Sequence, residues 1–141
     1  MTTPLQDPSQ RIADHFDELV RKTPGGPPWS HGDEVVWHVV STRCEIDMNG
    51  FASVFEQCLD RNDVAFLITA FEELEEPDLA RAFAAAQSLL FDAGFDAMRM
   101  NCADLPADVQ ERLSAIGASI VKGNRLWGID GKLVRLLDRE G

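Results

Sequence analysis

Tyrosine, disulfide-type cysteine patterns and long apolar runs are all missing from this chain. No apolar run approaches the roughly 18 residues of a membrane span. The three cysteines, Cys44, Cys58 and Cys102, are an odd number without a C-x-x-C spacing, which predicts reduced and mostly buried thiols. The first ten residues are polar and contain no signal-peptide core. We therefore expect a cytoplasmic protein that does not enter a membrane.

Lysine and arginine are scarce in one part of the chain. Residues 33–78 contain twelve carboxylates and only two cations, Arg43 and Arg61, which gives this stretch a net charge of −10. The other 95 residues carry twelve carboxylates and eleven cations, a net charge of −1. The total of −11 is therefore a local property. Such a field repels phosphates, so it argues against direct nucleic-acid binding and favours a basic protein partner.

Apolar residues recur at helical rather than strand spacing. Asp7 and Pro8 are typical of a helix start, and Ser30 with Asp33 fits a capping box ahead of a helix that runs to about Asp47. The run from Val35 to Val40 is also typical of a strand when taken alone. No alternation with period two occurs in the chain. The sequence predicts an all-α, single compact domain of about seven short helices.

The remaining helices are predicted from their caps, breakers and apolar stripes. Residues 51–59 form a short helix, Asn62 caps the next one, Pro77 opens another that Gly94 ends, and two more follow the loop at residues 96–104. The predicted inward stripes include Val64, Leu67, Ile68, Phe71 and Leu74, and then Leu79, Phe83, Ala86 and Leu90. Residues 1–30 are expected to be an N-terminal helix and a Pro/Gly linker packed on a helical domain of residues 31–141.

Few side chains are spaced for catalysis or for metal binding. Glu34 and His38 share one helix face, but the chain has no Glu-x-x-His pair of the kind that di-iron bundles use. No GxSxG, P-loop or GxGxxG motif is present. Cys102 is the thiol best placed to be a nucleophile, and no histidine lies near it in sequence. We predict no enzyme, no metal and no cofactor, with a small enzyme that uses Cys102 as an alternative.

The acidic stretch supplies the candidate binding site. Glu72 and Glu76 are like charges four residues apart, and the carboxylates near them crowd the end of a helix, where the helix dipole disfavours anions. A stretch that tolerates this repulsion indicates a negative surface for a partner, while the alternative is a solvated face without a role. The predicted partner-binding residues are Glu45, Asp47, Glu56, Asp60, Asp63, Glu72, Glu73, Glu75, Glu76 and Asp78.

The segment from Glu45 to Gln57 resembles the signature of the DNA mimic protein 19 family. Glu45, Gly50, Phe51 and Phe55 match the pattern Glu-x-x-Asn-Gly-Gly-Phe-x-Gln-Tyr-Phe-x-Asn. The other polar positions depart from it, as in Met48, Asn49, Ser53, Val54 and Gln57. From the residues alone, the motif is structural: Asn49 and Gly50 form a tight turn between two helices, and Phe51 and Phe55 pin the second helix to the core. The resemblance covers residues 33 to about 122.

The resemblance implies a bacterial, helical and non-enzymatic protein that presents carboxylates in place of DNA phosphates. It implies a DNA-binding regulator as the basic partner, and a homodimer as the assembly. Two alternatives stay open. One is an immunity or antitoxin-type protein that neutralises a basic toxin. The other is a helical domain with an incidental acidic face.

Overall fold

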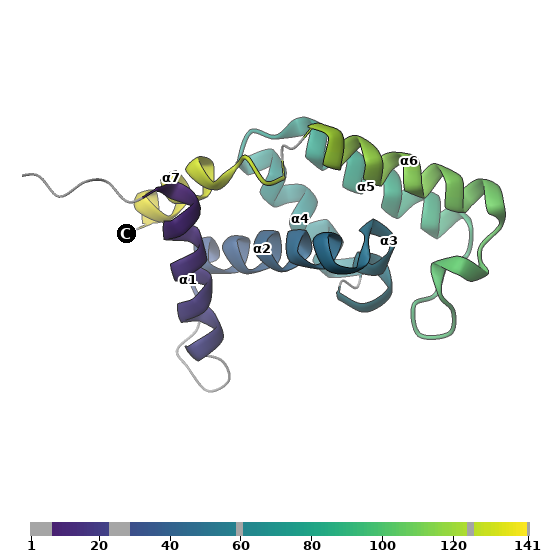
Figure 1. Ribbon diagram of the computed structural model, residues 1–141, viewed down its shortest axis with the longest axis horizontal. Helices are drawn as coiled ribbons and strands as arrows, with labels where there is room; N and C mark the ends of the chain where they lie inside the picture. Colours follow the sequence, from purple (N-terminus) through teal and green to yellow (C-terminus); the bar gives the residue numbers. More distant parts are fainter. Residues whose placement is uncertain (1–6, 23–28, 59–60, 124–125, 141) are drawn as a thin grey trace, which may run out of the picture.

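Helices make up all the regular structure in the described residues, 7–22, 29–58, 61–123 and 126–140, of the computed structural model (Figure 1). The seven α-helices are α1 (Pro8–Lys22), α2 (His31–Asn49), α3 (Phe51–Ser53), α4 (Arg61–Glu73), α5 (Pro77–Asp92), α6 (Ala107–Gly123) and α7 (Asp130–Glu140). A π-helix, η1 (Val54–Cys58), follows α3, and a 3-10 turn, η2 (Cys102–Asp104), precedes α6. The predicted all-α fold is confirmed. No described helix is both long and apolar enough to cross a membrane.

The longest helix, α2, begins where the sequence predicts it. Ser30 Oγ accepts a hydrogen bond from the backbone N–H of Asp33 at 3.1 Å, and the Asp33 carboxylate accepts one from the N–H of Ser30 at 3.1 Å. This capping box satisfies two amides that the first turn leaves open. Val35, Val36, Val39 and Val40 are buried along the helix, so tertiary packing supports a helix where β propensity alone favours a strand.

Two local predictions were wrong, and a third lies outside the described residues. That third one is the predicted cap at Asn62, whose side chain is not described at the start of α4 (Arg61–Glu73). Cys44 is exposed rather than buried, because it lies two residues from both Thr42 and Ile46, whose side chains face the core. The predicted helix at residues 51–59 is α-helical only to Ser53 and continues as η1. Phe51, Val54 and Phe55 are buried as expected.

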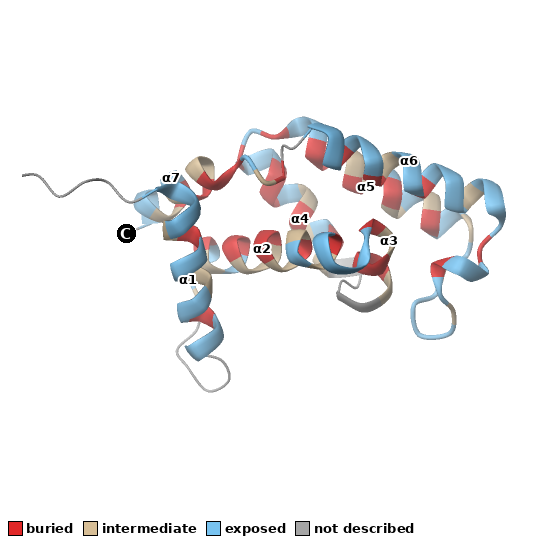
Figure 2. Ribbon diagram, in the orientation of Figure 1, coloured by how far each residue is buried: buried red, intermediate tan, exposed pale blue. Residues whose placement is uncertain are grey.

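Two helical layers enclose the core. α1 crosses α2 and packs against α7, while α4, α5 and α6 follow one another in space as they do in sequence (Figure 1). Buried positions face inward between these layers (Figure 2). Four phenylalanines meet at the centre, where the ring of Phe83 lies 5.6 Å from that of Phe51 and 5.3 Å from that of Phe71. Phe55 completes this group, which joins α3 and η1 to α4 and α5.

The ends of α4 and α5 have the same geometry and different residues. At the end of α5, Phe95 N–H donates to Leu90 O, and Gly94 stands between them with φ at +76°. At the end of α4, Glu76 N–H donates to Phe71 O, and Glu75 has φ at +60°. Both are Schellman endings, which favour glycine in the left-handed position. Glu75 therefore carries backbone strain of about 1 kcal/mol that Gly94 does not.

The N-terminal part of the predicted organisation is described only in part. α1 packs on α2 and α7, and Trp29 packs against Trp37, with ring centroids 5.1 Å apart. Trp37 also stacks on Phe16 of α1 at 5.0 Å. The predicted Pro/Gly linker at residues 24–28 lies outside the described residues.

Candidate protein-binding surface

Eight of the ten predicted carboxylates lie in two groups at different places on the molecule. Asp60 lies outside the described residues, and Asp63 stands apart, with its Oδ1 3.4 Å from His38 Nε2. The turn group surrounds the α4–α5 turn and comprises Glu72, Glu73, Glu75, Glu76 and Asp78. The groove group lies at the end of α2 and on η1 and comprises Glu45, Asp47 and Glu56. Glu73 contacts His31 at the start of α2, whereas Glu45 lies fourteen residues farther along that helix. At the helical rise, this is about 21 Å.

Most carboxylates of the turn group are paired within the molecule. Glu76 is buried, and its Oε1 lies 2.8 Å from Lys132 Nζ. Glu73 Oε1 lies 2.7 Å from His31 Nε2, and Asp78 forms an ion pair with Arg81. Among the described residues, only Glu72 and Glu75 of this group are exposed without a cationic partner.

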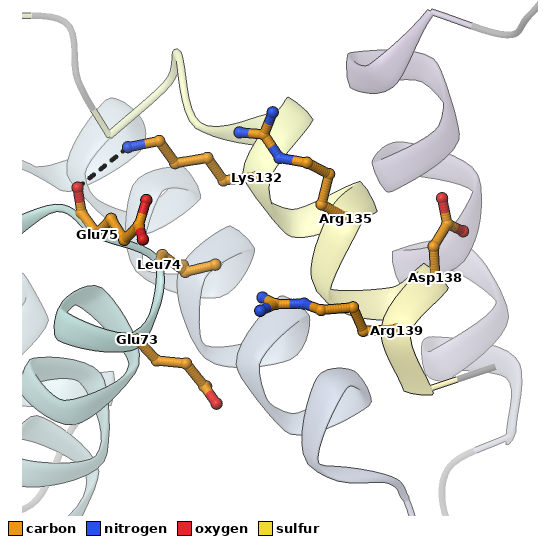
Figure 3. Close-up of a pocket in the computed structure, with 7 residues that line it drawn as sticks. All are labelled: Glu73, Leu74, Glu75, Lys132, Arg135, Asp138 and Arg139. Carbon is orange, nitrogen blue, oxygen red and sulfur yellow. Dashed lines mark hydrogen bonds between the residues drawn. The ribbon is translucent and has the colours of Figure 1, made fainter.

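The cations of α7 line a cavity of about 460 Å³ beside the turn group (Figure 3). Lys132, Arg135 and Arg139 are spaced along one side of the helix and face Glu73 and Glu75 across the cavity. Lys132 Nζ also donates to the backbone oxygen of Glu75 at 3.1 Å, which ties the left-handed turn to α7. The negative charge of the turn group is therefore offset by cations from a distant part of the sequence.

Three histidines connect α2 to its neighbours through carboxylates. His15 Nε2 of α1 lies 2.7 Å from Asp33 Oδ1. His31 and His38 approach carboxylates of α4, and the ring of Phe66 lies 5.9 Å from the first and 4.5 Å from the second. The hydrogen bond to Glu73 raises the pKa of His31. Burial acts against ionisation of Asp33, but the hydrogen bonds from His15 and Ser30 prevail and lower its pKa.

The hydrogen bonds that the structure describes for the groove group come from neutral donors. Glu45 Oε1 accepts from Ser53 Oγ at 2.5 Å. Asp47 Oδ2 accepts from Trp127 Nε1 at 3.1 Å. Glu56 Oε1 accepts from the backbone N–H of Cys102 at 2.6 Å. In the part of the chain that the structure describes, neither Asp47 nor Glu56 pairs with a lysine, arginine or histidine, so both keep their charge uncompensated.

Arg43, one of the two cations of the acidic stretch, is turned away from the surface. Its Nη1 lies 2.7 Å from Asp130 Oδ1, and the two side chains are only 13% and 7% exposed. This pair joins α2 to the first turn of α7 and uses the arginine internally. The acidic stretch consequently has one cation fewer to offset its exposed carboxylates.

A groove of about 660 Å³ runs between α3 and α6 beside the groove group. Its lining is mostly apolar or small and includes Ile46, Phe51, Ala52, Leu113, Ala118 and Val121. A side chain at Gly117 would clash, because its Cβ would lie 2.7 Å from the Cβ of Phe51. Gly117 is therefore what allows α6 to approach α3. Among the described residues that line the groove, Glu56 is the one carboxylate.

Cys102 lies in the same groove and is not activated. Burial, together with the charge of Glu56, raises the pKa of its thiol to about 12. A nucleophilic cysteine needs a lowered pKa, whereas the pKa of Cys102 is raised, which disfavours the reactive thiolate. The thiol also hydrogen-bonds with Glu56 and lies 3.9 Å from the backbone oxygen of Ala52, and no histidine contacts it among the described residues.

The described side chains do not form a metal site. No group of three or more histidine, cysteine, aspartate or glutamate side chains among them could hold a metal ion. Glu34 and His38 share a helix face, as the sequence predicts. His38 Nδ1 hydrogen-bonds within the helix to the backbone oxygen of Glu34 at 2.7 Å, so this ring nitrogen is already engaged.

Comparison with known proteins gives no relative. No family model, no curated protein and no solved structure matches this chain. The resemblance to the DNA mimic protein 19 family therefore stays a prediction. The structure describes the local part of that motif: Gly50 has φ at +92° between α2 and α3, and Phe51 and Phe55 are buried. The contacts of Asp47 with Trp127 and of Glu56 with Cys102 have no sequence signal, because each pair is distant along the chain.

Proposed function

We propose that this protein is a non-enzymatic, acidic interaction module that binds a basic protein through the face that carries the groove group. The observation that supports this proposal is that no lysine, arginine or histidine of the described residues pairs with Asp47 or Glu56. Their donors, an indole N–H and a backbone N–H, orient the carboxylates and leave the negative charge for a partner. A DNA-binding regulator is the partner that the family resemblance suggests.

The turn group is less suited to this role. Glu73 holds α4 against α2, and Glu76 holds the α4–α5 turn against α7, so their charges are used in folding. Arg135 and Arg139 stand opposite Glu73 and Glu75 and would repel a basic partner. Charges that steer a partner must stay uncompensated in the free protein.

Capture from a lysate of the source cells, with two matched charge-removal variants as baits, tests the proposal. Asp47→Asn with Glu56→Gln removes two charges and keeps both hydrogen-bond acceptors. Glu72→Gln with Glu75→Gln removes two charges at the turn. We expect a basic protein to bind the wild type and the turn variant, to be lost with the groove variant, and to be released by salt.

Adding duplex DNA to the same capture separates the candidate partners. A regulator held by its DNA-binding surface is displaced by DNA, whereas a toxin held by an immunity-type protein stays bound. Equal retention by both variants, or binding that salt does not weaken, contradicts the proposal and favours an incidental acidic face.

A further inference from the structure

We infer that the groove between α3 and α6 receives an amphipathic helix of the partner, with apolar side chains in the groove and one lysine or arginine directed at Glu56. This inference rests on the proposed function and names the partner's element. Helices bind hydrophobic grooves through anchors spaced three and four residues apart.

The dimensions of the groove fit one face of a helix. On α6 its lining runs through Gln110, Ser114, Gly117 and Val121, which recur every three or four residues. From Gln110 to Val121 the helix rises about 16 Å. A partner helix laid along this length presents about three turns, enough for apolar anchors at i, i+4 and i+7.

Small residues keep the groove open. Ala52 and Gly117 line it where α3 meets α6, and Ala118 lines its α6 side while remaining exposed to solvent. Val121, at one end of the groove, is an apolar side chain that is 54% exposed to solvent. Larger side chains at the alanine positions would fill the space. An apolar partner surface can therefore enter the groove without displacing core residues.

Glu56 decides the charge of the occupant. A carboxylate has about four acceptor positions, and in the part of the chain that the structure describes Glu56 accepts hydrogen bonds from one residue, Cys102, through its backbone N–H and its thiol. Any apolar occupant removes water from this half-buried carboxylate, and burying an unpaired charge is strongly unfavourable. A lysine or arginine on the occupant restores the lost solvation, so a basic helix is preferred over an apolar or acidic one.

The same residue argues against a second copy in the groove. A two-fold arrangement brings the same patch of both subunits together. Two copies packed groove to groove would bring two Glu56 carboxylates together, and Asp47 with them, without a cation in the described part of this surface. Repulsion between these charges opposes that dimer.

Two fluorescein-labelled helical peptides test the inference. Both carry leucine at i, i+4, i+7 and i+11; the remaining exposed positions are lysine in one and glutamate in the other. Fluorescence polarisation at low salt measures their binding. We expect the lysine peptide to bind and the glutamate peptide not to bind. Glu56→Gln, which keeps the bond to Cys102, should weaken the lysine peptide at least about tenfold.

Matched substitutions on α6 locate the peptide. Ala118→Trp fills the groove and should abolish binding, whereas Ala115→Trp places the same side chain at an exposed position outside it and should not. Val121→Arg, at the exposed end of the groove, should also weaken binding of the lysine peptide. It replaces Ala118→Trp as the test if that variant is less stable. Circular dichroism melting checks each variant.

The possible outcomes separate this inference from the proposed function. Failure of the lysine peptide to bind, or equal binding to the groove-filling and control variants, overturns the inference. If the groove-filling and control variants bind the peptide equally, but binding still requires lysine and is weakened by salt, the proposed acidic module is supported and the groove is not its binding site. Equal binding of the lysine and glutamate peptides contradicts the proposed function as well.

Discussion

The turn group and the groove group come from one acidic stretch and have different surroundings. Around the α4–α5 turn, the folded chain brings Lys132, Arg135 and Arg139 opposite the carboxylates. At the end of α2, Trp127 and Cys102 approach instead, and they contribute only neutral donors. The difference shows that the charge of a sequence segment does not fix the charge of its surface. What fixes it is which residues of the rest of the chain fold against that segment.

Of the substitutions that test this difference between the two groups, Lys132→Ala should have the largest effect on stability. Lys132→Ala leaves the buried carboxylate of Glu76 without its cation and unties the left-handed turn at Glu75. Loss of one partner of a buried ion pair should lower the free energy of unfolding by about 3 kcal/mol. Thermal and urea denaturation measure the loss. Arg135→Ala, an exposed cation of the same helix, should change stability by less than about 0.5 kcal/mol.

A second change to the same pair checks the cause. Adding Glu76→Gln to Lys132→Ala removes the unpaired charge and should recover part of the stability. If the single variant is as stable as the wild type, Glu76 is not structural and the turn group is free to bind a partner.

Gly117→Ala tests how closely α6 packs against α3 beside the groove group. The added Cβ would lie 2.7 Å from the Cβ of Phe51, so α6 must move away from α3. Overpacking of this kind should destabilise the protein by about 2 kcal/mol. Gly131→Ala is the matched control, because nothing lies within 4 Å of its added Cβ, and it should be neutral or slightly stabilising. Equal melting temperatures for the two variants would show that the groove wall is not closely packed.

Glycine substitutions in the turn group should have opposite signs. Glu75→Gly relieves a left-handed backbone conformation and should stabilise the protein by up to about 1 kcal/mol. Glu72→Gly, in the last turn of α4, removes the same charge and should destabilise by up to about 1 kcal/mol. Melting of the two variants separates backbone strain from charge. Stabilisation by both would assign the effect to relief of repulsion.

The smallest expected effect depends on pH. Because Glu73 raises the pKa of His31 in the folded protein, the pair stabilises the fold fully below the unfolded histidine pKa of about 6.5. That contribution is lost as pH rises through the raised folded value. The side chains are 48% and 38% exposed, so we expect less than about 1 kcal/mol. The stability difference between wild type and His31→Gln should shrink from about pH 6 to pH 8. A difference that grows over this range contradicts the assignment.

Local chemistry made the helices predictable. The capping box at Ser30, Pro77 at the start of α5 and Gly94 after its end are signals read within a few residues, and the structure has all three. The predicted cap at Asn62 stays a prediction, because its side chain lies outside the described residues. The π-helix has no such signal, since α3 and η1 bury the same phenylalanines that an α-helix would.

The candidate site was predictable only as a set of residues. The sequence shows where carboxylates are concentrated, but the partner of each one is set by tertiary contacts. Lys132 reaches Glu76 across 56 residues, and Trp127 reaches Asp47 across 80. The groove was not predicted at all, because it depends on how closely α6 approaches α3, and Gly117 alone does not identify its neighbour.

The contacts of α7 also bear on how the protein emerges from the ribosome. Arg11 of α1 pairs with Asp138, 127 residues later, and the N–H of Gly32 at the start of α2 donates to Glu140, 108 residues later. During synthesis, α1 and α2 thus appear long before the helix that covers them. Their apolar residues, such as Ile12 and Val35, must wait for it. The N-terminal helices should therefore become protected from hydrogen exchange only when α7 docks, late and in one cooperative step.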